Sequence, residues 1–255
     1  MDTTCLGTLR LQNCTKLKTI VLKGISMSDH KLLLPESITS ITIYRVNTSK
    51  DVKLSLQHCT SLQKLDLNAV KLGDKLVLPD SITELKLFHV TGCLSSFTSL
   101  QNLSRLQKIS LGYINLGDLE LRFPVSVKNI KLCALEMSRG LPLQANSQLI
   151  ELEIRSMNLA NTELKLPDSI TEIEMAGVTM SALGVQELCH HFQRLPHAVT
   201  FKTGACTIEP INDYKQFIER LKTMTDVGIE IISRLVDNEI VIRFNCNSSA
   251  ASSEL

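Results

Sequence analysis

The sequence has little of several features that mark common functional classes. Aromatic residues make up 4% of it, as three Tyr and seven Phe, and the 27 Lys and Arg nearly balance the 26 Asp and Glu. A near-neutral chain has no long-range field that attracts nucleic acid or an anionic membrane. No apolar run approaches the roughly 18 residues of a membrane span, and no signal-peptide pattern opens the chain. We expect a cytoplasmic protein that binds neither nucleic acid nor membrane.

Signals of catalysis are also scarce. The eight cysteines are scattered, without the paired clusters of secreted disulfide-capped domains, so we expect reduced thiols. No Gly-x-x-x-x-Gly-Lys-Ser/Thr loop and no Ser, His and acid constellation can be singled out. Cys189, His190 and His191 are consecutive, but neighbours on a helix point in different directions and no second ligand pair accompanies them. We expect no enzyme, no catalytic residue, no metal ion and no cofactor.

Repetition is what the sequence has in abundance. Four apolar positions, separated by three, two and three residues, recur eight times. The first residues of these units are Leu17, Ile38, Leu62, Ile82, Leu106, Val127, Leu149 and Ile170. A unit of 20 to 24 residues cannot bury its own apolar side, so neighbouring units must stack and share one core. The spacing identifies the chain as resembling leucine-rich-repeat proteins.

The units alternate between two openings. One is the Leu-Gln opening, which begins at Leu11, Leu56, Leu100 and Leu143; the other is the Leu-Pro opening, which begins at Leu34, Leu78, Phe123 and Leu166. Like openings recur every 43 to 45 residues, which indicates duplication of a two-repeat block. Cys14 and Cys59 share one position in the Leu-Gln opening, and we expect both to be small buried packing residues.

The 3-2-3 spacing predicts one short strand in each unit, with two side chains turned inward and parallel pairing between units. The predicted strands cover 19–23, 40–44, 64–68, 84–88, 108–112, 129–133, 151–155 and 172–176. Prolines in the Leu-Pro openings disfavour helices between these strands. The expected fold class is an α/β solenoid: a leucine-rich-repeat horseshoe with a parallel inner-curve sheet, a mostly extended outer curve, and helices in the C-terminal repeats.

Leucine-rich repeats commonly carry Asn at the fourth apolar position, where its amide binds neighbouring backbone. Here that position holds Ile25, Val46, Val70, Val90, Ile114, Leu135, Met157 and Val178. We expect hydrophobic packing to replace the Asn ladder. The backbone groups of the turns then need other partners, and the hydroxyls of Thr15 and Thr60 are candidates.

The pattern changes after Met180. Ser181 is a predicted N-cap for a helix that buries Leu183, Leu188, Phe192 and Leu195, and a second helix is predicted after Asp213. Strands are predicted at 199–201 and 227–229, with a closing strand at 239–244. The predicted domains are a repeat array at 1–208, a helix-strand capping repeat at 209–244 and a disordered tail at 245–255.

The helix-strand stretch from Leu183 to Val199 resembles the longer repeats of the ribonuclease-inhibitor type. Such repeats form the sensor region of cytosolic NLR (nucleotide-binding, leucine-rich-repeat) innate immune receptors. The resemblance implies ligand sensing and autoinhibition of an ATP-driven oligomerising domain, which this chain does not contain. The array also starts within a repeat, so either the chain is a piece of a longer receptor or a partner covers the exposed edge.

Two clusters are candidate binding sites on the concave face. The first gathers aromatic and basic residues, as interface hot spots do: Tyr44, Arg45, Lys64, Lys86, Phe88, His89, Lys108, Tyr113 and Lys131. Two acidic residues, Asp66 and Glu84, lie between them and reduce the positive charge. The second is an acidic patch of Glu151, Glu153, Glu172 and Glu174. Like charges on adjacent strands repel, so Arg155, a basic partner or another receptor domain should cover them. Plain solvent exposure remains the alternative for both clusters.

The expected function is non-enzymatic recognition of a protein ligand on the concave face, as the ligand-sensing part of an NLR-like receptor. The alternative is a substrate-recruiting leucine-rich-repeat adaptor of a ubiquitin ligase. An F-box-like helical segment would favour that alternative, and none is visible before Leu11. A secreted binding domain would require a signal peptide and capping disulfides.

Overall fold

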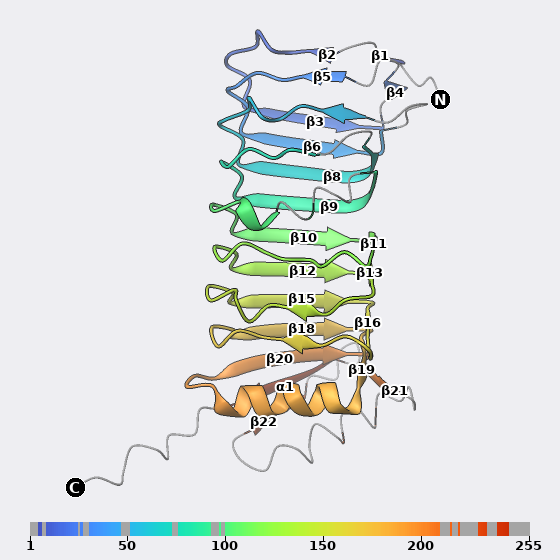
Figure 1. The fold of residues 1–255 in the computed structure, drawn as a ribbon, viewed down its shortest axis with the longest axis vertical. Helices are drawn as coiled ribbons and strands as arrows, with labels where there is room; N and C mark the ends of the chain where they lie inside the picture. Colours follow the sequence, from blue (N-terminus) through green and yellow to red (C-terminus); the bar gives the residue numbers. More distant parts are fainter. Residues whose placement is uncertain are drawn as a thin grey trace, which may run out of the picture.

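The chain forms a β-solenoid whose turns stack along one axis (Figure 1). The computed structural model describes residues 5–6, 9–24, 26–27, 31–46, 52–72, 76–92, 97, 100–209, 215, 219, 229–233 and 239–244. One long sheet of eleven strands runs through the stack, in the order β3-β6-β8-β9-β10-β12-β15-β18-β20-β23-β22. Among the described residues, no helix is long and apolar enough to cross a membrane.

Eight parallel strands lie where the repeat spacing predicts them. They are β3 (Thr19–Lys23), β6 (Ser40–Tyr44), β8 (Lys64–Lys71), β9 (Glu84–Thr91), β10 (Lys108–Gly112), β12 (Asn129–Cys133), β15 (Glu151–Arg155) and β18 (Glu172–Ala176). Neighbouring strands pair residue for residue in matching positions, and only β8 and β9 run further than predicted. The predicted parallel sheet is confirmed.

The core follows from the alternation of side chains along each strand. The second and fourth strand residues point inward, and Leu65, Leu67, Leu85 and Leu87 are at most 2% exposed. The fourth apolar position of the repeat is also buried in every unit that the structure describes there, while Ile25 lies outside the described residues. Hydrophobic packing at that position is confirmed.

Short strands line the other sides of the solenoid. They form small parallel sheets of β1 (Cys5–Leu6) with β4 (Ser26–Met27); β2 (Leu9–Arg10), β5 (Lys31–Leu33) and β7 (Lys53–Leu54); β11 (Asn115–Gly117) with β13 (Glu136–Met137); β14 (Leu141–Pro142) with β17 (Leu164–Lys165); and β16 (Asn158–Leu159), β19 (Thr179–Ser181) and β21 (Thr207–Glu209). Extended backbone between the long-sheet strands is therefore confirmed for these segments.

The two alternating openings complement each other through hydrogen bonds. In each Leu-Pro opening the Ser hydroxyl donates to a carbonyl of the preceding Leu-Gln unit: Ser37 to Leu17 (2.8 Å), Ser81 to Leu62 (2.6 Å), Ser126 to Leu106 (2.8 Å) and Ser169 to Leu149 (2.7 Å). The hydroxyls seen to serve the turns include these serines, one residue before the first apolar position, and Thr39, Thr83 and Thr171, one residue after it. This contact gives the two-repeat block a physical basis, because one opening supplies the donor and the other the acceptor.

Helix α1 (Ala182–Arg194) follows the last of the eight repeats. The Ser181 hydroxyl accepts a hydrogen bond from the Gly184 amide at 3.0 Å, as the predicted N-cap requires. The buried stripe consists of Val185, Leu188, Cys189 and Phe192. Leu183 is 62% exposed, so its predicted burial is wrong. It precedes Val185 by two residues, about 200° around the helix, and therefore lies on the opposite side.

The C-terminal end of the long sheet is antiparallel. Strand β23 (Glu239–Phe244) pairs with β20 (Val199–Gly204) on one side and with β22 (Ile229–Ser233) on the other. The strand predicted to close the array therefore lies inside the sheet, and β22 is outermost. The second predicted helix lies outside the described residues, except for Lys215 and Glu219, which are helical. The tail at 245–255 lies outside them too.

Candidate functional site

The long sheet presents one face away from the core, formed by the first, third and fifth residues of each strand. We call this the outward face. The residue after the fifth of these paired positions is left-handed in nine successive units, with φ between 47° and 61°, although β8 and β9 continue beyond it: Gly24, Arg45, Ala69, His89, Tyr113, Ala134, Ser156, Gly177 and Ala205. We call these residues the corner row. The Tyr113 amide, for example, donates to the Cys133 carbonyl at 2.9 Å, which ties the corner to the next strand.

The nine predicted aromatic and basic residues divide between these two surfaces. Lys64 and Lys108 are first strand residues, Lys86 and Lys131 are third, and Tyr44 and Phe88 are fifth, so all six lie on the outward face. Arg45, His89 and Tyr113 belong to the corner row, one position beyond the five paired strand residues rather than on the sheet face as predicted. A left-handed residue interrupts the two-residue alternation on which that placement depended.

Three of the predicted aromatic rings come together on β9 and β10. The rings of His89 and Tyr113 are stacked, with centroids 4.2 Å apart and an interplanar angle of 9°. The Phe88 ring lies over Gly112, whose missing side chain leaves the space. Tyr113 is 50% exposed. We call Phe88, His89 and Tyr113 the aromatic cluster. It forms a ring-rich surface at the edge of the outward face that contributes little to the core.

Cys133 contacts the cluster, whereas Tyr44 and Arg45 lie apart from it. Hydrogen bonding with the Cys133 thiol on β12 raises the pKa of the Tyr113 hydroxyl. Tyr44 and Arg45 do not join the cluster, because β8 lies between their strand and β9. The Arg45 guanidinium instead lies 5.1 Å from the centroid of the Tyr44 ring. The predicted aromatic residues thus form two separate groups.

Three of the predicted lysines form ion pairs with acids of the same sheet. Glu84 binds Lys64 at 3.4 Å and Lys86 at 2.9 Å, and Lys131 binds Glu153. The hydrogen bond from Lys86 lowers the pKa of Glu84 and raises that of Lys86. Burial raises the pKa of Asp66, against the attraction of Lys86. Lys108 forms no ion pair within the described part of the chain. It lies opposite Glu84 at the start of β10, four residues before Gly112 and therefore about 13 Å along the strand from the aromatic cluster.

The acidic patch is covered from within the chain. Glu151 lies opposite Glu172, and Glu153 opposite Glu174, as the sequence predicts. The partners are Asn129 for Glu151, Lys131 and Arg155 for Glu153, Arg155 for Glu174 and Lys202 for Glu172. Sequence reasoning named Arg155 but missed Lys202, although its position on β20, opposite Glu174, follows from the register. The patch is therefore a network in which three cations and the Asn129 amide bind the four carboxylates, and not an open acidic surface.

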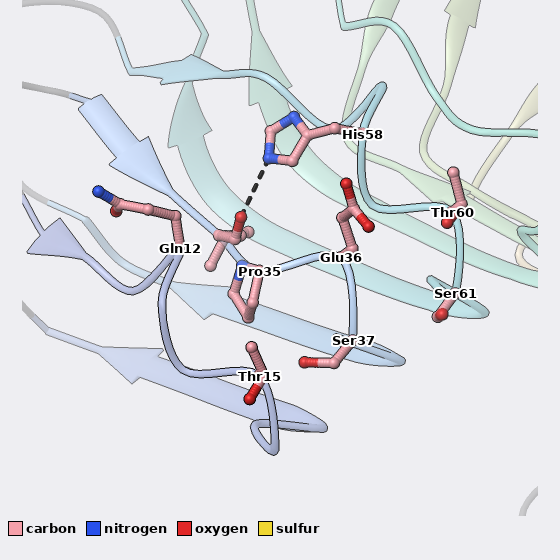
Figure 2. Close-up of a pocket in the computed structure, with 9 residues that line it drawn as sticks. Gln12, Thr15, Pro35, Glu36, Ser37, His58, Thr60 and Ser61 are labelled. Carbon is pink, nitrogen blue, oxygen red and sulfur yellow. Dashed lines mark hydrogen bonds between the residues drawn. The ribbon is translucent and has the colours of Figure 1, made fainter.

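Sequence reasoning also missed a polar groove at the opposite ends of the strands. It holds about 520 Å³ and lies between Leu-Gln and Leu-Pro openings (Figure 2). The groove is lined by Gln12, Thr15, Leu34, Pro35, Glu36, Ser37, His58, Thr60 and Ser61. The His58 ring contacts the Leu34 carbonyl at 3.0 Å (Figure 2). A second groove of about 520 Å³ repeats it around Pro79, one block along. The recurring openings are the signal that could have found both.

The described residues hold no group of three or more His, Cys, Asp or Glu side chains that could bind a metal ion. Burial raises the pKa of Cys189 to about 12, so its thiol stays protonated and unreactive near neutral pH. Cys59 is buried as predicted, whereas Cys14 is exposed, so its predicted burial is wrong.

Comparison of the chain with protein-family models, curated proteins and solved structures found no match.

Proposed function

We propose that the chain is a leucine-rich-repeat recognition module without enzymatic activity, which binds a protein partner through the aromatic cluster and the adjoining outward face. The repeat spacing and the eight in-register strands support the family. The order of α1, Leu195, Pro196 and β20 supports a likeness to the sensor repeats of cytosolic NLR receptors. In this proposal the ligand-sensing surface is the long sheet.

The aromatic cluster is the observation that carries the proposal. Exposed rings are costly to leave in water, and Tyr is among the residues that most often dominate binding energy. Here two of the chain's ten Phe and Tyr residues, Phe88 and Tyr113, gather with the His89 ring on adjacent units of the sheet. The ion pairs of Lys64, Lys86 and Glu84 lie on one side of the cluster, toward the start of β8 and β9, as one part of a polar rim would. Lys108, at the start of β10, favours an extended partner segment whose carboxylate lies about four residues from the apolar or aromatic side chain that contacts the cluster.

The proposal is tested with Phe88→Ala combined with Tyr113→Ala. The matched control combines Val125→Ala with Ile150→Ala, which removes two exposed apolar side chains away from the cluster. Immobilised wild type and both variants are incubated with cell lysate, and bound proteins are quantified by mass spectrometry and then titrated individually. We expect the cluster variant to lose at least about 2 kcal/mol of binding, close to 30-fold in Kd, with unchanged melting. Equal binding by wild type and the cluster variant would overturn the proposal.

A further inference from the structure

Ser110 lies on the outward face of β10, between β9 and β12 in the middle of the stack (Figure 1). It is the third residue of its strand and only 8% exposed, whereas the side chains opposite it, Lys86 and Lys131, are 43% and 58% exposed. None of the described residues forms a hydrogen bond with the Ser110 hydroxyl. A polar group that is so deeply buried usually has a hydrogen-bond partner, so this hydroxyl is available to a ligand.

The outward-face positions that surround Ser110 are positively charged. They are Glu84, Lys86 and Phe88 on β9, Lys108 and Gly112 on β10, and Asn129, Lys131 and Cys133 on β12. Three lysines and one glutamate give this ring of neighbours a charge of +2, in a chain whose total charge is +1. The positive charge is therefore local to Ser110, and it favours a small anion bound above the hydroxyl.

The three lysines can reach such an anion. Lys108 forms no ion pair with the described residues, and Lys86 and Lys131 each bind a carboxylate of the sheet. An ammonium group carries three donors, so the paired lysines keep donors free, and exposed ion pairs of this kind rearrange at little cost. Neighbouring strands are about 4.8 Å apart and residues two positions along a strand about 6.6 Å, distances that a lysine side chain spans.

The donor set matches a phosphate monoester better than a carboxylate. A phosphorylated side chain carries a charge of about −1.5 to −2 near pH 7 and presents three acceptor oxygens. A carboxylate carries one charge and two oxygens. Three ammonium groups from three sides and one hydroxyl from below therefore balance the charge of a phosphate and supply a donor for each of its oxygens.

The aromatic cluster lies close enough to be contacted by the same ligand. Gly112, under the Phe88 ring, is two residues beyond Ser110 on β10, about 6.6 Å along the strand. In an extended polypeptide, side chains two residues apart point to the same side and have the same separation. The exposed lysines would hold an isolated phosphate only weakly, so an apolar side chain at this distance should add most of the affinity.

We propose that Ser110, Lys86, Lys108 and Lys131 bind the phosphate of a phosphorylated side chain in an extended partner segment. The phosphorylated residue is two positions from the side chain that contacts the aromatic cluster, closer than a carboxylate bound by Lys108 alone. This inference rests on the proposed function for its partner, and adds that binding of the partner depends on phosphorylation.

The probes are the peptide GTSTFTG phosphorylated on its serine and the same peptide without phosphate. Binding to the isotope-labelled full chain is followed through the amide signals of Ser110 and Gly112 in NMR spectra, up to about 5 mM peptide. We expect saturable shifts at both amides and at least about tenfold tighter binding of the phosphorylated form. Phosphorylated GTSTTFG has the same composition, but its Ser and Phe side chains point to opposite sides, so it should bind about as weakly as inorganic phosphate.

Ser110→Ala removes the hydroxyl and keeps a small side chain, so melting should change little. It should weaken binding of the phosphorylated peptide by about fivefold or more and leave the affinity for the unphosphorylated peptide unchanged, whereas a purely structural role of Ser110 would alter both. Lys108→Gln should weaken binding of the phosphorylated peptide about threefold. The matched control is Lys23→Gln, an exposed lysine of the outward face four strands away on β3, for which we expect a change below about twofold.

Equal affinity for the two forms of GTSTFTG, or equal losses in Lys108→Gln and Lys23→Gln, would overturn the inference. If capture of the lysate partner still required the cluster, the proposed function would stand. Conversely, inorganic phosphate that shifts the Ser110 amide equally in wild type and in the cluster variant would support the phosphate site even if lysate capture did not need the cluster. Tighter binding of adenosine monophosphate than of phosphorylated GTSTFTG would assign the site to a nucleotide and contradict the inference.

Discussion

The ring of Phe88 lies over the backbone of Gly112 on the neighbouring strand, where a Cβ atom would come within 2.5 Å of two ring carbons. One residue further along each strand, the rings of His89 and Tyr113 stack on each other. Both contacts follow from one strand register, because Phe88 is paired with Gly112 and the next residues in each strand's direction are His89 and Tyr113. A glycine on one strand and a ring on the next therefore position the aromatic cluster.

Leu87→Ala should destabilise the fold. Leu87 is 2% exposed and lies in the middle of the stack. The substitution loses transfer free energy and leaves a cavity, and together these should lower the free energy of unfolding by about 2 to 5 kcal/mol. Urea unfolding of wild type and variant measures the difference. Lys86→Ala on the outward face of the same strand is the control, with an expected cost below about 1 kcal/mol. A loss below about 1 kcal/mol for Leu87→Ala would contradict the inward register.

The long sheet could be predicted from sequence because the pattern is strong and local. Leu85 and Leu87 are two residues apart, and the same pair recurs in every unit, so both the strand and its inward face follow from one period. The position of Lys202 opposite Glu174 also follows once the register is known. Residues that obey the repeat were therefore predictable from their neighbours alone.

Other features depend on conformations that the repeat does not encode. The corner row carries residues as different as Arg45, Ala69 and Tyr113 in left-handed backbone, so no glycine signal marked it. The antiparallel pairing of β23 with β20 joins segments far apart in sequence, and a strand pattern does not specify direction. Phe88, His89 and Tyr113 were predicted among nine residues of one face, but their grouping and the stacking of His89 on Tyr113 depend on the corner geometry.

Two glycines should respond very differently to alanine. Gly177 has φ +61° with no atom nearer than 3.8 Å to an added Cβ, and alanine already occupies equivalent corner positions. Gly177→Ala should therefore cost about 1 kcal/mol of left-handed strain. Gly92 has φ +86°, and a Cβ there would lie 1.9 Å from the Leu72 carbonyl oxygen. Gly92→Ala should cost clearly more in thermal or urea unfolding, and equal costs would contradict the close approach to Leu72.

The free energy of unfolding should decrease in acid because Glu153 becomes protonated. Partial burial alone would raise its pKa, but hydrogen bonds from Lys131 and Arg155 outweigh burial and lower the pKa below 4.5. Because the folded state then binds the proton more weakly than the unfolded state, this contribution is present near pH 7 and disappears as the pH falls through the lowered pKa. Melting between pH 7 and pH 3 should drop more steeply for wild type than for Glu153→Gln. Parallel curves would show that the ionic network adds no pH-dependent stability.

Gly112→Ala should displace the Phe88 ring without unfolding the strand. Gly112 does not need left-handed backbone, and Ala is favoured over Gly in a strand interior by about 0.5 to 1 kcal/mol, so stability should change little. The added methyl group meets ring carbons of a side chain that can rotate away. In NMR spectra the wild-type Gly112 Hα protons should therefore show an upfield ring-current shift that Phe88→Ala removes. For a partner that requires the cluster, Gly112→Ala should weaken binding. In the Gly112→Ala background, Phe88→Ala should then weaken binding by less than it does in the wild type, because the ring has already left its position. Strictly additive losses would mean that Gly112 does not position Phe88.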